Sequence, residues 1–207
     1  MSSSSSSRNR EPLEPQRDVG RQRVAELLQA AAAVIQERGF DAATMAEIAA
    51  RADAKIGSLY RFFPNKEAVA EALARRLLEA LEAEFEAIRT QAAGAAPEAV
   101  ADALIDLFVR LQPQAQAATS LLESRTDWTA VRARFRGQAL AGVKAALSAC
   151  APDLGEEEAE AVAAVVLNNM KTLAHMLRNE SPTSQGAPEQ LRLMNRLYLA
   201  ATLAPRA

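Results

Sequence analysis

Hydrophobic residues recur at three- and four-residue intervals along most of this 207-residue chain. That period places them on one face of an α-helix, so it predicts a series of amphipathic helices. Strand-forming runs of Val, Ile, Thr and aromatic residues are missing, which argues against a sheet. We therefore predict an all-α fold of about nine helices.

The two longest hydrophobic stripes lie in the first half of the chain. The first ends before Gly39, which is typical of a helix C-terminus, and the second follows Asn65, a favourable N-cap. The first stripe comprises Val24, Leu27, Leu28, Ala31, Val34 and Ile35, and the second comprises Val69, Leu73, Leu77, Leu81, Phe85 and Ile88. The second predicted helix is long enough to join two domains.

Proline and glycine separate the helices predicted farther along the chain. The breaks fall at residues 94–97, at Pro113, before Trp128, at 152–155 and at 182–188. We expect Pro113 to end one helix and Trp128 to begin another. The last two helices are predicted at 156–179 and 188–203.

Residues 44–66 contain two short helical patterns joined by a tight turn. Thr44 and Glu47 have the spacing of a capping box at the start of the first helix. The second helix should bury one face, made by Ile56, Leu59 and Phe63. Its opposite face carries Lys55, Ser58, Tyr60 and Arg61. Because such groups donate to phosphates and to guanine edges, the pattern predicts a helix-turn-helix whose second helix enters the major groove of DNA.

At these residues the chain resembles the TetR family of repressors, over roughly residues 20–70. The family pattern runs Thr, Ile-Ala, Ala-Gly-Val-Ser, Gly-x-Leu-Tyr-x-x-Phe and Lys. The corresponding residues here are Thr44, Ile48-Ala49, Ala52-Asp53-Ala54-Lys55, Gly57-Ser58-Leu59-Tyr60-Arg61-Phe62-Phe63 and Lys66. Two departures from the pattern stand out: Asp53 replaces the turn glycine, and Lys55 replaces the serine before the recognition helix.

The two departures concern the turn and the start of the recognition helix. Aspartate tolerates a left-handed backbone better than most residues, so we expect the turn to survive with Asp53. Lysine cannot accept an amide hydrogen bond, so another group must cap the helix that follows Lys55. Asp53 is the nearest candidate for that cap.

The resemblance implies how this domain contacts DNA. We expect Ser58 and Arg61 to read bases, and Thr44, Tyr60 and Lys66 to bind phosphates. The full set of expected DNA contacts is Thr44, Arg51, Lys55, Ile56, Ser58, Tyr60, Arg61 and Lys66. Three arginines near the start of the first helix either reach phosphates or form a solvated face: Arg17, Arg21 and Arg23.

Charge changes this picture only slightly. Residues 1–66 carry 10 Lys and Arg against 8 Asp and Glu, and residues 67–207 carry 14 against 18. The positive excess favours DNA at the N-terminal end, but weakly. We divide the chain into a Ser-rich arm at 1–16, expected to be disordered, a helix-turn-helix DNA-binding domain at 17–66, and a ligand-binding and dimerisation domain at 67–207.

By the same resemblance, the second domain should form a homodimer and hold an apolar or amphipathic small-molecule effector. We assign the last two helices to the dimer interface, although periodicity also allows them to complete the core of one protomer. The expected interface residues are Val162, Val166, Leu173, Leu191, Met194 and Tyr198. The expected pocket residues, each more often an ordinary core or surface residue, are Phe108, Leu111, Leu122, Trp128, Phe135, Asn169, Met170, His175 and Met176.

The chain lacks the residue patterns of an enzyme. It has one histidine, one cysteine (Cys150), no glycine-rich phosphate loop and no Gly-x-Ser-x-Gly elbow, so we expect no catalysis, no metal and no cofactor. No apolar run approaches a membrane span, and the N-terminus lacks the apolar core of a signal peptide, so we expect a cytoplasmic protein.

We therefore expect a homodimeric transcriptional regulator, above all a repressor, that binds a palindromic operator in double-stranded DNA and is released by a small apolar molecule. The alternative is a helical protein-interaction module that no longer binds DNA. The departures at Asp53 and Lys55 leave that alternative open.

Overall fold

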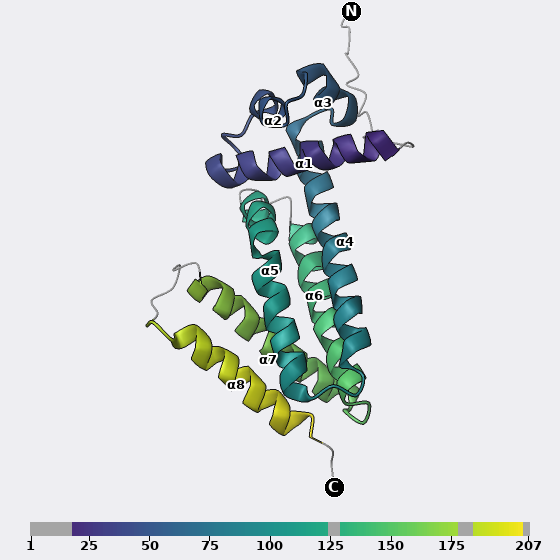
Figure 1. The fold of residues 1–207 in the computed structure, drawn as a ribbon, viewed down its shortest axis with the longest axis vertical. Helices are drawn as coiled ribbons and strands as arrows, with labels where there is room; N and C mark the ends of the chain where they lie inside the picture. The colour runs from purple at the N-terminus through teal and green to yellow at the C-terminus, as the bar shows by residue number, and fades with distance from the viewer. Residues whose placement is uncertain (1–17, 124–128, 178–183, 205–207) are drawn as a thin grey trace, which may run out of the picture. The chain divides into compact units, whose positions relative to one another are not determined.

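The computed structural model describes residues 18–123, 129–177 and 184–204, and within these ranges it contains eight helices and no strand (Figure 1). The helices are α1 (Asp18–Arg38), α2 (Met45–Arg51), α3 (Ile56–Phe62), α4 (Lys66–Ala92), α5 (Pro97–Glu123), α6 (Thr129–Cys150), α7 (Glu156–Leu177) and α8 (Ala187–Thr202). The all-α prediction is confirmed, with a helix count close to the one expected. None of the helices in the described ranges is both long and apolar enough to cross a membrane.

The chain divides into two compact units. The first comprises Met1–Arg76 with Gln116–Thr126, and the second comprises Leu77–Ala115 with Asp127–Ala207. The chain passes from the first unit to the second within α4, and it crosses between the units again within α5. The domain boundary predicted after residue 66 lies at the start of α4.

Helices α1, α2 and α3 build the core of the first unit. Leu27, Ile48 and Leu59, one from each helix, are completely buried, and Val69 from the start of α4 is buried with them. Each of these residues lies on the apolar stripe of its own helix, so burial follows from the three- and four-residue spacing. Helices α2 and α3 have only seven residues each, and this shared core is what holds α3 in place.

The second unit has a larger core to which every one of its helices contributes. Phe85 of α4, Leu104 of α5, Leu147 of α6, Met170 of α7 and Leu199 of α8 are all buried in it. At Gly142 of α6 the backbone lies directly against the ring of Phe85, so that any side chain there would overlap the ring. Glycine is therefore required at this position for packing.

One predicted helix boundary is wrong. Pro113 was expected to end a helix, whereas α5 continues through it to Glu123. A proline inside a helix removes one backbone donor and crowds the carbonyl four residues earlier, but the Ala-, Gln- and Leu-rich residues that follow Pro113 favour helix strongly enough for it to continue. This continuation accounts for a count of eight helices where about nine were expected. Trp128, predicted to begin the next helix, lies outside the described residues, and α6 begins at Thr129.

Polar contacts fix α8 to its neighbours within the second unit. Arg192 and Arg196 both bond the carboxylate of Asp102 on α5, and Arg192 also bonds Asp106 at 2.8 Å. On the other side, buried Asn195 accepts a 3.1 Å hydrogen bond from Asn169 of α7. A buried amide pair of this kind favours one register between two helices.

The exposed apolar residues of the last two helices differ from those expected at a dimer interface. Val162, Val166 and Leu173 are buried in the core of their own protomer, so for these three the alternative of a core role applies. Leu191 and Tyr198 pack partly against that core, and Met194 is 48% exposed. The large hydrophobic residues exposed on the two helices are Val165, Leu177, Leu193, Met194 and Leu197.

Candidate nucleic-acid interface

A capping box positions the start of α2, as predicted. The hydroxyl of Thr44 accepts the amide hydrogen of Glu47 at 3.2 Å, and the Glu47 carboxylate accepts the amide of Thr44 at 3.1 Å. The Thr44 hydroxyl also donates to that carboxylate at 2.9 Å, and this bond is the main reason that the pKa of Glu47 is lowered. Thr44 thus has a structural role here, and its phosphate contact stays a prediction.

The turn between α2 and α3 has the geometry of a Schellman motif. The amide of Asp53 donates to the Ala50 carbonyl at 3.2 Å, and the amide of Ala54 donates to the Ala49 carbonyl at 2.9 Å. Asp53 holds the left-handed position of this motif with φ of 45°. The expectation that aspartate can replace glycine in this turn is therefore confirmed.

Within the described part of the chain, no side chain caps the start of α3. Lys55 is the N-cap residue, and it makes no side-chain capping hydrogen bond. The suggested cap by the Asp53 side chain is therefore wrong for the described residues, and the backbone of Asp53 instead closes the preceding turn. The backbone alone starts the helix, with the amide of Ser58 donating to the Lys55 carbonyl at 2.8 Å.

The two faces of α3 separate clearly. Leu59 and Phe63 are buried, as predicted, but Ile56 is 45% exposed and its expected burial is wrong. Ile56 is the first residue of the helix, and because its Cβ tilts toward the N-terminus, no earlier turn of α3 covers it. Tyr60 is 49% exposed, Lys55, Gly57 and Arg61 are exposed, and Ser58 is half-buried.

Two cations of this surface are available to an outside anion. Within the described residues, neither Lys55 nor Arg61 has a hydrogen-bond or ion-pair partner. Lys55 is the N-cap residue of α3, and Arg61 directly follows exposed Tyr60 in the sequence. A cationic, phenolic and partly apolar surface on one short helix suits contact with both phosphates and base edges.

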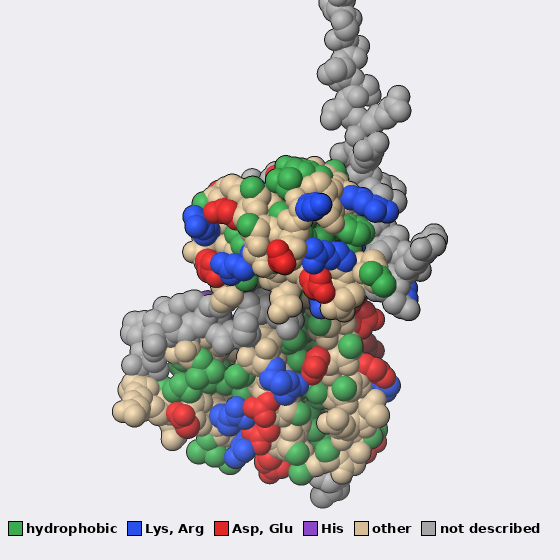
Figure 2. Space-filling model, turned by 45° about the horizontal axis from the view of Figure 1, so that its top comes forward, with side chains coloured by type: hydrophobic (Ala, Val, Ile, Leu, Met, Phe, Trp, Pro, Cys, Tyr) green, Lys and Arg blue, Asp and Glu red, His purple; other side chains and the backbone are tan. Residues whose placement is uncertain are grey.

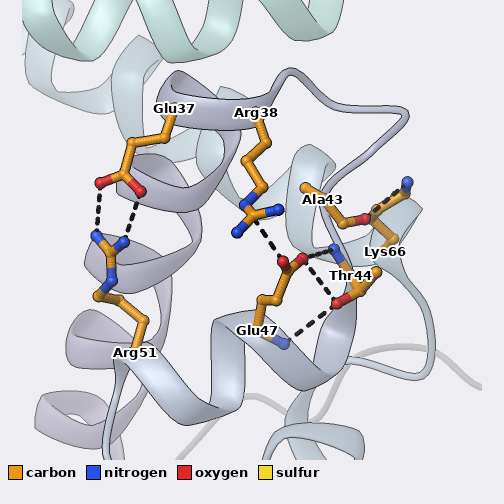
Figure 3. Close-up of polar contacts among 7 residues, drawn as sticks. All are labelled: Glu37, Arg38, Ala43, Thr44, Glu47, Arg51 and Lys66. Atoms are coloured by element: carbon orange, nitrogen blue, oxygen red, sulfur yellow. Dashed lines mark hydrogen bonds and ion pairs between the residues drawn. The ribbon is translucent and has the colours of Figure 1, made fainter.

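Arg51, by contrast, is paired within the protein. Its guanidinium makes two bonds to the Glu37 carboxylate of α1, at 2.8 and 2.6 Å (Figure 3). These bonds lower the pKa of Glu37 and raise that of Arg51. Arg38 forms a second ion pair, at 3.2 Å, with Glu47. A DNA contact by Arg51 stays a prediction, and it would require the guanidinium to share or leave Glu37.

Lys66 is engaged even more fully. Its ammonium donates to the carbonyls of Phe40, Asp41 and Ala43 at 2.6, 3.0 and 3.0 Å, and lies 4.5 Å from the centre of the Phe40 ring. An ammonium has three donors, and all three are used. Figure 3 shows the side chain directed at the loop before Thr44. The phosphate contact stays a prediction, although the structure gives Lys66 a different set of partners.

Charge on the surface of the first unit is mixed. Figure 2 shows Lys and Arg side chains interspersed with Asp and Glu on the visible face of its helices. An open groove of about 450 Å³ lies between α1 and α2. Its lining includes both ion pairs, Glu37 with Arg51 and Glu47 with Arg38. Lys55 and Arg61 are therefore individual unpaired cations on a surface of mixed charge, within the described residues.

Arg23 is a residue whose role the sequence left undecided. Its guanidinium donates to the carbonyls of Ala52 and Asp53 at 3.3 and 2.9 Å and pairs with Glu26 at 2.8 Å. The first two bonds hold the turn before α3. Backbone carbonyls occur at every residue, so no pattern of residue types could have revealed this contact.

The residues expected to line an effector pocket fall into three groups. Phe108, Leu111 and Phe135 are half-buried against the core of the second unit, and Met170 is part of that core. Asn169 is bonded to Asn195, Met176 is half-buried and His175 is exposed. Leu122 and Trp128 lie outside the residues whose side chains are described. The effector contacts remain predictions.

Comparisons with known proteins agree with the helix-turn-helix geometry. Residues 27–73 match the family model described as bacterial regulatory proteins, tetR family. No curated protein is similar enough in sequence to match the chain.

Solved structures match over most of the chain. A TetR-family transcriptional regulator from Streptomyces coelicolor is 27% identical with a TM-score of 0.58, covering 87% of this chain and 99% of its own. A TetR transcription regulator from Haloarcula marismortui is 22% identical with a TM-score of 0.63, covering 88% and 99%. A tetR-family regulatory protein from Rhodococcus RHA1 is 19% identical with a TM-score of 0.63, covering 90% and 99%.

The family model covers the domain that contains α2 and α3, and the structural matches extend through the helices that follow. Residues 27–73 therefore match the tetR family of bacterial regulatory proteins, and the chain as a whole has the fold of the tetR-family transcriptional regulators that it resembles.

Proposed function

We propose that this protein is a DNA-binding transcriptional repressor that acts as a homodimer on a palindromic operator and is released by a small molecule. One observation carries the proposal. Helix α3 and its two cap residues bury Leu59 and Phe63 and expose Lys55, Tyr60 and Arg61. The two lysine and arginine side chains are unpaired within the described residues, so they are free to bind an anionic partner.

The dimensions of α3 fit the major groove. Seven residues of α-helix are about 10 Å long, and the groove of B-DNA is about 12 Å wide. In this position Ser58 and Arg61 would read bases, while Lys55 and Tyr60 would bind phosphates. Two copies of α3 would occupy successive major grooves about one helical turn apart.

We assign the homodimer contact to α7 and α8. Leu193, Met194 and Leu197 are 45, 48 and 62% exposed and share one face of α8. Val165 and Leu177 of α7 are also exposed. Exposed apolar side chains gathered on neighbouring helices are typical of a surface that a partner covers. This replaces the buried Val162, Val166 and Leu173 as candidate contact residues.

The effector would act on the second unit. Half-buried Phe108 and Phe135 give that unit aromatic surface suited to an apolar molecule. Because α4 runs without interruption from Lys66 to Ala92, it contributes residues to both units. An effector that prefers one arrangement of the second unit would shift the population toward it and lower the affinity for DNA.

Selection from a random-sequence DNA pool, followed by a gel shift with a scrambled competitor, tests the proposal. A repressor of this kind should enrich a palindromic sequence and bind it in preference to the competitor. Enrichment of no sequence would contradict the proposal and favour the protein-interaction module.

A further inference from the structure

We propose that Arg23 and Lys66 are positioning residues that hold α2 at its two ends by binding backbone carbonyls, and thereby fix the start of the recognition helix α3. The inference rests on the proposed function, because it concerns how the DNA-reading helix is held. It assigns these two cations to the protein's own backbone, whereas a basic residue in a DNA-binding domain is commonly taken to contact phosphate.

The turn that follows α2 creates the need for Arg23. A Schellman motif satisfies the carbonyls of Ala49 and Ala50, but it leaves those of Ala52 and Asp53 without a partner from the turn itself. Asp53 also adopts φ of 45°, a left-handed conformation that costs less for glycine than for any other residue. This turn is therefore weaker than the glycine turn it replaces.

Arg23 supplies the missing partners. Its two terminal nitrogens reach the Ala52 and Asp53 carbonyls at 3.3 and 2.9 Å, and Glu26 holds the guanidinium at 2.8 Å. A guanidinium can make this fork of bonds because its donors are fixed in one plane. Arg23 thus connects α1 to the turn at the end of α2, where Asp53 holds the left-handed backbone.

Lys66 does the same at the other end of α2. Its ammonium donates hydrogen bonds to the carbonyls of Phe40, Asp41 and Ala43. These three residues belong to the loop that leads from α1 into Thr44. Lys66 is the first residue of α4. The loop that enters α2 is therefore tied to α4, while the turn that leaves α2 is tied to α1.

These two ties matter because α3 has little to fix its own start. No side chain caps its first turn at Lys55, and only a few residues separate Lys55 from the carbonyls that Arg23 holds. A shift of the turn would move the first residues of α3, which include Ser58. The whole helix would then meet the base pairs in a different register. A loss of either tie should therefore reduce sequence discrimination more than overall attraction to DNA.

Amide hydrogen exchange on the protein alone tests the ties directly. In Arg23→Ala, the amides of Asp53 and Ala54 should exchange about five- to tenfold faster than in the wild type, because the turn opens more often. Arg23→Lys keeps the charge but loses the planar fork of donors. In this variant the exchange rates of the two amides should lie between those of the wild type and those of Arg23→Ala. Glu71→Ala, which removes an exposed charged side chain from α4, is the control and should leave these two amides unchanged.

A rescue variant separates a positioning role from a general loss of stability. Replacing Asp53 by glycine removes the cost of the left-handed backbone, so Arg23→Ala/Asp53→Gly should recover most of the protection lost in Arg23→Ala. For Lys66, Lys66→Met should accelerate exchange of the Ala43 amide, which donates to the Gly39 carbonyl at 3.2 Å. Unchanged exchange at Asp53, Ala54 and Ala43 in these variants would overturn the inference.

DNA binding gives the second readout, with a duplex that the wild type selects from a random pool and a scrambled duplex of equal length. Arg23→Ala should bind the selected duplex about tenfold more weakly, bind the scrambled duplex as the wild type does, and keep the same dependence on salt. Equal weakening on both duplexes, with a salt slope smaller by about one, would show a phosphate contact and overturn the positioning role. A wild type that selects no sequence would refute the proposed function, and hydrogen exchange alone would then decide this inference.

Discussion

Lys55 and Lys66 show how much the surroundings of a residue decide its role. Both are lysines at the edge of the recognition helix, and the sequence alone assigns both to DNA. Lys55 is exposed and unpaired within the described part of the chain, whereas all three donors of Lys66 are used by carbonyls. We therefore expect the two residues to respond oppositely to the same substitution.

Lys66→Met should destabilise the protein, and Lys55→Met should not. Loss of the Lys66 ammonium leaves three carbonyls with one partner fewer, at a cost of at least about 1 kcal/mol, or about 2–4 °C in Tm for a chain of this size. Thermal unfolding followed by circular dichroism measures the difference. Lys55→Met should instead lower the salt slope of DNA binding by about one. Equal Tm values for the two variants would contradict the assignment of Lys66.

Tyr60→Phe tests the exposed phenol of α3. The hydroxyl is expected to donate to a phosphate, and a hydrogen bond of this kind is worth about two- to tenfold in affinity. Binding to the selected duplex should weaken by that factor, with no change in the Tm, because Tyr60 is 49% exposed and its ring remains in phenylalanine. An unchanged affinity would remove Tyr60 from the interface.

At this scale the sequence predicts contacts between side chains better than contacts to the backbone. The capping box of Thr44 and Glu47 was predictable because its two residue types occur at a fixed spacing. Burial of Leu59 and Phe63 followed from helical periodicity, which failed only for Ile56 at the helix end. The ties of Arg23 and Lys66 were not predictable, since their partners are carbonyls that any sequence supplies.

Among the helices, α6 contains two glycines in opposite situations. A side chain at Gly142 would overlap the ring of Phe85, whereas one at Gly137 would meet open space. Gly142→Ala should therefore destabilise the protein by about 1–3 kcal/mol through overpacking. Gly137→Ala should stabilise it by up to about 1 kcal/mol, since alanine favours the helix. Urea unfolding measures both, and a stabilising Gly142→Ala would refute the close packing of α6 on α4.

The contact between α5 and α8 should depend on pH. The pKa of Asp102 is lowered, first by the hydrogen bond from Arg196, and Arg192 adds to the effect. A carboxyl with a lowered pKa in the folded state contributes stability above its ordinary pKa of 3.8, and that contribution is lost as the pH falls through the folded value. Asp102→Asn should thus lower the free energy of unfolding near pH 6. Near pH 2, where this contribution is already lost in the wild type, the substitution should change the free energy of unfolding little.

Urea unfolding at the two pH values measures this effect, with Asp153→Asn as a control at an exposed position of the turn between α6 and α7. An equal loss of stability at both pH values would mean that Asp102 acts through something other than its charge.

Helix existence was predictable at this scale, whereas one helix end was not. The stripes that predicted α1 and α4 are buried apart from half-buried Val24 and Leu73, and Gly39 and Gly94 adopt positive φ just beyond the ends of these helices. Pro113 was misleading because a helix can absorb one proline when the residues around it favour helix. Local sequence signals a possible break, but the balance of neighbouring propensities decides it.

For the whole molecule, the dimer assignment depends on the exposed face of α8. Leu197→Glu places a charge at the centre of the apolar set formed by Leu193, Met194 and Leu197. We expect this variant to be monomeric in sedimentation velocity and to lose binding to a palindromic duplex, because burial of an unpaired charge is costly. Ala141→Glu, at an exposed position of α6, should remain dimeric. A dimeric Leu197→Glu would move the interface elsewhere.

The sequence could predict that the last two helices carry apolar faces, but not which residues of α8 face outward. Apolar residues lie on two sides of this helix, with Leu199 buried in the protomer and Leu197 largely exposed. A period of 3.6 residues identifies apolar stripes and cannot tell the protomer core from a partner surface. The three-dimensional packing of α7 was needed to separate the two sides.

The central claim is that α3 reads DNA, and its most direct test is the affinity of the wild type and of Arg61→Met for a selected and a scrambled duplex across a salt series. The wild type should prefer the selected duplex, and log K should fall linearly with log salt. Arg61→Met should lose much of that preference. If Arg61 reads a base, the difference in binding free energy between the two duplexes should fall by about 1–3 kcal/mol. Equal binding of both duplexes by the wild type, or an Arg61→Met variant with unchanged preference, would contradict the claim.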